Sequence, residues 1–140
     1  MSLPHQKLVA WQRADELVIE IHRLTHQRLP ALEQRELGSQ LRRAAFSVAA
    51  NIVEGTVRWT SRDALRFFNI ASASLAELGY GLHVAHRLGY IDLPDLHAFE
   101  AKVRMVSAPL HGLIRRYRSG RVLTGLTIAL LAGTAHSLLS

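Results

Sequence analysis

Four stretches of this sequence repeat apolar residues at steps of three and four, and this periodicity constrains the fold more than any other feature. Such spacing places apolar side chains along one face of an α-helix and leaves the opposite face polar. The stretches cover residues 8–27, 33–54, 61–88 and 93–117. Alternating apolar and polar runs, which are typical of β-strands, are nearly absent. The sequence therefore predicts an all-α fold built from four helices.

Local signals predict where the first three helices begin and end. Pro30 closes the first helix, because proline cannot continue the hydrogen-bond ladder. Gly55 is the expected C-terminal cap of the second helix. Thr60 or Ser61 opens the third helix, which ends at Gly89. The apolar arc of the third helix is expected to consist of Ala64, Phe67, Ala71, Leu75, Leu78, Leu82 and Ala85.

The fourth helix is expected to contain one irregularity. Asp92 caps its start, and Pro94 is tolerated in the first turn. Pro109 lies inside the apolar pattern, so we expect a kink or a break near Ala108. Because all connections are short, the sequence predicts that the four helices form an antiparallel up-and-down four-helix bundle over residues 1–119.

Residues 120–140 form an apolar C-terminal segment of different composition. No charged residue follows Arg121. A membrane span needs about 20 strongly apolar residues, and the glycines, threonines and His136 weaken this segment as a span. We expect a short helix that packs on a neighbouring subunit, or a poorly ordered tail. A membrane anchor is the less favoured alternative.

Neither composition nor motifs favour an enzyme. The chain has no cysteine, which removes disulfides, thiolate nucleophiles and cysteine-bound metals. Glycine-rich nucleotide motifs and nucleophile-elbow motifs are absent. His22 with His26, and His83 with His86, share helix faces, but a catalytic zinc needs three protein ligands. We expect no catalytic residue, metal or cofactor, and the polar N-terminus predicts a cytoplasmic protein without a signal peptide.

Positive charge is concentrated in the pair Arg42 and Arg43 and in two larger arginine clusters. Lys and Arg number 17 against 11 Asp and Glu, which gives a formal net charge of +6. The residues of one cluster are spaced four apart and are expected to form a ridge at the start of the third helix. The other cluster lies at the end of the fourth helix, where the helix dipole also stabilises positive charge. Trp59 either stacks on an unpaired base or packs under the adjoining loop. The candidate nucleic-acid contacts are Arg58, Arg62, Arg66, Arg115, Arg116 and Arg118.

A polar strip runs beside the apolar face of the second helix. From Gln40 to Glu54, its five members are spaced three, four, four and three residues apart, which confines them to one line on the helix. A comparable strip on the third helix contains Arg62, Arg66, Asn69, Ala73, Glu77 and Tyr80. The strips are either solvated faces or polar contacts that fix helix register or assembly. In the second case the two strips contact each other through Arg–Glu pairs, within one chain or between chains. The strip residues singled out are Gln40, Arg43, Ser47, Asn51, Glu54 and Glu77.

Several segments carry a family resemblance. Residues 39–55 resemble the hallmark segment of the 23S rRNA-intervening-sequence proteins, also called the four helix bundle protein family. Trp11 with Ala14, residues 66–78 and residues 88–91 are similar to further segments of that family, in the same order. The resemblance implies a bundle that assembles into a ring, typically a homopentamer. Many members are encoded inside ribosomal RNA gene insertions, and a related branch of retroelement accessory proteins works with a reverse transcriptase and nucleic acid.

These observations lead to two functional hypotheses. The first is a non-enzymatic homo-oligomer that binds the phosphate backbone of RNA or DNA, or acts as a scaffold. The alternative is a protein–protein interaction module without nucleic-acid binding, whose arginines pair with acidic residues across subunits. The partners expected are further copies of the chain, RNA or DNA, and a partner protein; a membrane is not expected.

Overall fold

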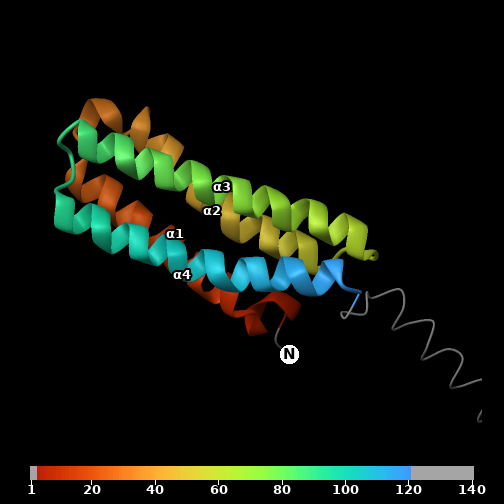
Figure 1. Cartoon of the computed structure of the whole chain (residues 1–140). Coiled ribbons are helices and arrows are strands. Elements are labelled where there is room, and N and C mark those ends of the chain that lie inside the picture. Colours follow the sequence, from red (N-terminus) through yellow and green to blue (C-terminus); the bar gives the residue numbers. More distant parts are fainter. Residues whose placement is uncertain (1–2, 121–140) are drawn as a thin grey trace, which may run out of the picture.

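The computed structural model describes residues 3–120, and every regular element in that range is a helix (Figure 1). Two short 3-10 helices, η1 and η2, accompany four long α-helices. The apolar segment 120–140 and its membrane alternative lie, apart from Gly120, outside the described residues. The elements are η1 (Pro4–Lys7), α1 (Val9–Arg28), η2 (Ala31–Glu33), α2 (Leu37–Thr56), α3 (Ser61–Arg87) and α4 (Leu93–Arg118).

The four long helices run alternately up and down and form the predicted antiparallel bundle (Figure 1). Each helix packs on two neighbours, in the cyclic order α1, α2, α3, α4, and α2 with α3 forms the most extensive interface. This order brings the end of α2, the start of α3 and the end of α4 to one end of the bundle. None of the described helices combines the length and apolar character needed to cross a membrane.

A single apolar core lies between the helices and receives residues from all four. Ile21, Ile52, Leu78 and Leu110 are fully buried, as the periodicity predicts. One residue of the apolar arc predicted for the third helix is wrong. The prediction placed Phe67 in the core, but Phe68 is buried and Phe67 only partly so. The two positions differ by a single helical step, so periodicity alone did not separate them.

The second helix begins four residues later than predicted, at Leu37 rather than Glu33. Gln34 explains the delay, because its side-chain amide donates to the carbonyls of Thr25 and Leu29 at the end of α1. Arg42 of α2 in turn donates to the backbone carbonyl of Gln34. These contacts hold the segment before α2 as a cap on α1.

Gly55 is not the C-terminal cap that the sequence predicted. The helix continues through it to Thr56, and the positive φ angles of the described residues occur only at Gly89 and Gly120. Gly55 is buried, and a Cβ atom there would overlap the ring of Phe68. Glycine at this position allows α2 and the Phe68 ring of α3 to approach closely.

The other predicted helix ends are confirmed. Thr60 Oγ1 accepts a hydrogen bond from the Asp63 amide at the start of α3 (3.1 Å). Asp92 Oδ1 accepts one from the Asp95 amide at the start of α4 (2.8 Å). Gly89, with φ of 81°, follows the last turn of α3.

Of the kink or break predicted near Ala108, the break is wrong. α4 is continuous from Leu93 to Arg118 and includes Pro109. A side chain from α1 satisfies the carbonyl that the proline leaves without a helical donor.

Candidate functional site

The two predicted arginine clusters meet at one end of the bundle. Arg62 and Arg66 of α3 and Arg118 of α4 line the same open cleft, which has a volume of about 930 Å³. They meet because α3 begins where its antiparallel neighbour α4 ends (Figure 1). The rest of the lining consists of Ser61, Asp63, Leu65, Asn69, Tyr117 and Gly120.

The electrostatics of this basic cleft favour an anion. Its lining contains three arginines and one acidic residue, Asp63. Within residues 3–120, none of these three arginines has a carboxylate at ion-pairing distance. The first turn of α3 also lines the cleft, and unpaired backbone N–H groups at a helix N-terminus carry partial positive charge. Together these groups suit phosphate oxygens.

Tyr117 adds a phenol to the basic cleft. Its ring packs edge-on against Phe68, with centroids 4.9 Å apart. Desolvation by burial raises the pKa of Tyr117 above its ordinary value of 10.0, and the nearby charge of Arg116 partly offsets this by lowering it. The phenol therefore remains protonated at neutral pH and is able to donate a hydrogen bond. Sequence periodicity placed residue 117 only at the end of the stretch 93–117 and missed its place in the cleft, although the antiparallel topology sets residue 117 opposite residues 61–65.

Arg58 does not belong to the predicted ridge. It lies in the loop before α3, so its four-residue step to Arg62 is not a helical step. Its guanidinium forms an ion pair with Glu54 and lies over the Phe67 ring, 4.4 Å from the centroid. Arg66 approaches the same ring at 5.1 Å. Arg58 is thus engaged within the chain, at the border of the basic cleft.

The remaining predicted arginines lie outside the cleft lining. Arg115 and Arg116 are exposed on the last turn of α4, where they complement the helix dipole. Trp59, in the loop between α2 and α3, is 61% exposed. The alternative that Trp59 packs under this loop is therefore wrong.

The polar strip of α2 divides into two parts. Ser47 contacts α3, because its Oγ lies 2.8 Å from Ser74 Oγ. Asn51 is bonded to Ser47 within α2, where its Nδ2 donates to the Ser47 carbonyl (2.8 Å) and to Ser47 Oγ (3.0 Å). Gln40, Arg43 and Glu54 are exposed. No Arg–Glu ion pair joins α2 to α3 in the part of the chain that the structure describes, where Glu54 pairs with Arg58 instead.

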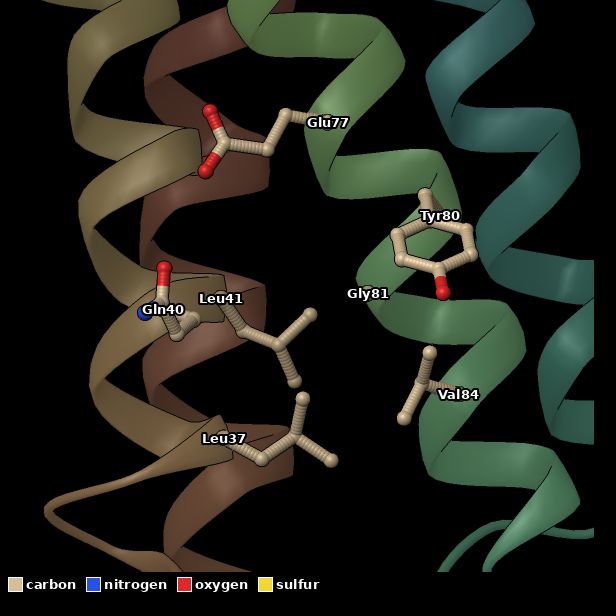
Figure 2. A pocket seen from close by; sticks show the side chains of 7 residues that line it. All are labelled: Leu37, Gln40, Leu41, Glu77, Tyr80, Gly81 and Val84. Atoms are coloured by element: carbon tan, nitrogen blue, oxygen red, sulfur yellow. The ribbon is translucent and has the colours of Figure 1, made fainter.

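Gln40 and Glu77, one from each strip, border an apolar pocket between α2 and α3 at the opposite end of the bundle (Figure 2). The pocket has a volume of about 320 Å³. In Figure 2 the side chains of Leu37, Leu41 and Val84 converge on it. Gly81 lets the helices approach, because a Cβ atom there would lie 2.6 Å from Leu41 Cδ2. The remaining lining residue is Tyr80, which is 69% exposed.

The histidine pairs do not form a metal site among residues 3–120, where no three metal-ligating side chains gather. The rings of His22 and His26 are 6.3 Å apart. His83 stacks on Tyr80, and His86 Nδ1 lies 3.0 Å from the Ile91 carbonyl oxygen in the turn between α3 and α4.

Comparison with known protein families identifies a match. A family model described as 23S rRNA-intervening sequence protein matches residues 6–112. This range includes Arg62, Arg66 and the polar strip, and it ends before the arginines at the end of α4. No curated protein matches the chain.

Proposed function

Because the chain belongs to the 23S rRNA-intervening sequence protein family, we propose that it is a non-enzymatic, homo-oligomeric protein that binds the phosphate backbone of RNA or DNA. One observation carries the proposal: Arg62 and Arg66 of α3 and Arg118 of α4 line one open cleft without carboxylate partners within residues 3–120. Family membership alone does not specify a ligand. The chemistry of the basic cleft favours a phosphate.

In this proposal the basic cleft holds the backbone rather than reading base edges. Guanidinium groups form bidentate hydrogen bonds with phosphate oxygens. The start of α3 and the phenol of Tyr117 contribute further donors. Such contacts fix the position of a nucleic acid and carry no sequence information. The protein therefore acts as a scaffold with broad sequence tolerance.

Assembly would multiply the weak charge of one chain. The family resemblance implies five subunits, and five copies at a formal +6 each carry about +30. A ring of this charge concentrates an anionic partner around its axis. Light scattering coupled to gel filtration counts the subunits, and a mass other than that of five chains overturns the pentamer. We place the protein in the cytoplasm, which cell fractionation tests.

Salt-dependent binding tests the nucleic-acid proposal. Anisotropy of a labelled 20-nucleotide RNA is measured between 50 and 200 mM salt. Three phosphate contacts on a single strand give a salt slope near −2, so the affinity falls about 20-fold over this range. The triple variant Arg62→Glu, Arg66→Glu, Arg118→Glu should lose binding.

A charge-matched control separates the basic cleft from net charge. Arg35, Arg87 and Arg104 are exposed and lie outside the cleft lining. Their triple change to Glu removes the same charge and should keep most of the binding. Equal loss in both triple variants, or no binding at 50 mM salt, overturns the proposal. Circular dichroism confirms that each variant is folded.

The apolar pocket between α2 and α3 favours the alternative, a protein–protein module without nucleic-acid binding. The pocket is of a size that accepts one apolar side chain of another chain, with Gln40 and Glu77 at its border. Charge reversal at Arg62 and Arg66 separates the two hypotheses. Loss of nucleic-acid binding with the assembly intact supports the first hypothesis, whereas a broken assembly supports the alternative. If the pocket is an interface between subunits, Val84→Asp should weaken their association under either hypothesis.

A further inference from the structure

The loop between α2 and α3 presents Trp59 at the border of the basic cleft. Ser61 lines the cleft and follows Trp59 by two residues, so the two Cα atoms lie within about 8 Å of each other. Trp59 is 61% exposed and makes no ring-to-ring contact among the described residues. The other tryptophan, Trp11, is half-buried and packs on His5 with centroids 4.6 Å apart. Of the two indoles, that of Trp59 is the one open to a partner.

Both chain neighbours of Trp59 are held in place. Arg58 is fixed by its ion pair with Glu54 and by its position over Phe67. Thr60 caps α3 through its hydrogen bond with the Asp63 amide. The indole is therefore presented from an anchored backbone, so little conformational entropy is lost when it binds a partner.

The partner of this indole should be flat and attached to an anion. Arg58 precedes Trp59, and Arg62 and Arg66 line the adjoining cleft. A nucleobase on a phosphate backbone combines an aromatic face with negative charge. Bases in a duplex are stacked on one another and present only their edges, whereas bases in a single strand are free to stack on a protein ring.

We infer that the basic cleft selects single-stranded over duplex nucleic acid, with an unpaired base stacked on Trp59 while Arg62, Arg66 and Arg118 hold neighbouring phosphates. This inference rests on the proposed function and adds the class of nucleic acid to it. Replacing an aromatic platform residue weakens single-strand binding about 5- to 150-fold. Duplex binding, which uses the arginines alone, should be unaffected by the same change.

The test compares a 20-nucleotide DNA strand with its 20-base-pair duplex at 50 mM salt. Trp59→Leu should weaken single-strand binding at least 5-fold and duplex binding less than 2-fold. Trp59→Phe keeps an aromatic face and should retain most of the single-strand affinity. Because Trp59 is exposed, both variants should unfold at the wild-type temperature.

Fluorescence supplies a second readout that does not depend on the Trp59 variants. In Trp11→Phe, Trp59 is the remaining tryptophan, and the single strand should quench its emission while the duplex leaves it unchanged. If Trp59→Leu loses the same affinity for the strand and for the duplex, or if the bound strand leaves the Trp59 emission unquenched, the inference is overturned and the proposed function stands. If the wild type binds neither the strand nor the duplex, the inference and the proposed function both fail.

Discussion

Arg13 of α1 donates a hydrogen bond of 2.8 Å from Nη1 to the backbone carbonyl of Met105 in α4. Met105 lies four residues before Pro109, and the proline nitrogen has no hydrogen to give that carbonyl its helical partner. A side chain from another helix thus takes the place of the missing amide. This contact joins α1 to α4 and satisfies the carbonyl at the point where the sequence predicted a break.

A double-mutant cycle tests this relationship. Arg13→Ala should lower the free energy of unfolding by about 1 kcal/mol, because it leaves the Met105 carbonyl without its donor. In a Pro109→Ala background, the amide of the new alanine supplies that donor, and the cost of losing Arg13 should fall below about 0.5 kcal/mol. Urea unfolding of the four proteins measures the coupling. The same cost in both backgrounds contradicts the interpretation.

Apolar spacing predicted the helices well because each helix buries one continuous face. It failed where a neighbouring helix decides the outcome. The start of α2 depends on hydrogen bonds among Gln34, Arg42 and the end of α1, which join residues up to 17 positions apart. The role of Gly55 depends on a ring from α3. Neither contact leaves a periodic signal in the sequence.

Gly55 of α2 and Gly79 of α3 should respond oppositely to alanine. At Gly55 a methyl group would meet the buried Phe68 ring, and Gly55→Ala should destabilise the protein by about 1–3 kcal/mol through overpacking. At Gly79 no atom beyond its chain neighbours and the adjacent backbone of α3 lies within 4 Å of the added carbon, so Gly79→Ala should stabilise α3 by about 0.5–1 kcal/mol through helix propensity. Thermal melts of both variants check the signs, and a stabilised Gly55→Ala would rule out the packing role.

Arg42 and Arg43 should differ in their effect on stability, although they are adjacent. Arg42 Nη1 lies 3.0 Å from Thr25 Oγ1 and 3.2 Å from Gln34 Oε1. Arg42→Ala should cost about 2 kcal/mol, since it removes several partly buried hydrogen bonds at once. Arg43 is exposed, and Arg43→Ala should change stability by less than about 0.5 kcal/mol. Equal denaturation midpoints for the two variants would show that the Arg42 contacts add nothing.

The candidate site was only partly predictable. The sequence predicted Arg62 and Arg66 in one arginine cluster and Arg118 in another. Their convergence follows from the antiparallel order of α3 and α4, which the sequence also predicts. The capture of Arg58 by Glu54 and Phe67 depends on side-chain conformation and has no sequence signature.

Alkaline pH should reveal the burial of Tyr117. Burial raises the pKa of its phenol above 10.0, the value of an exposed tyrosine, despite the opposing effect of Arg116. Above pH 10 the unfolded chain loses this proton before the folded chain does. The stabilisation is therefore complete below pH 10 and is lost as pH rises through the folded pKa. Tyr117→Phe keeps the ring contact with Phe68 and removes the titration, so wild type should lose more stability than this variant between pH 9 and pH 11. Parallel losses would contradict the shift.

The arginines at the end of α4 should make unequal contributions to nucleic-acid binding. Arg118 lines the basic cleft, whereas Arg116 lies outside the lining on the same helical turn. Arg118→Ala should weaken RNA binding and reduce the salt slope by about 0.7, the value for one phosphate contact on a single strand. Arg116→Ala removes the same charge from nearly the same place and should leave the slope nearly unchanged. Titrations at four salt concentrations give both slopes. If the slopes fall equally, binding follows net charge at the helix end rather than the basic cleft.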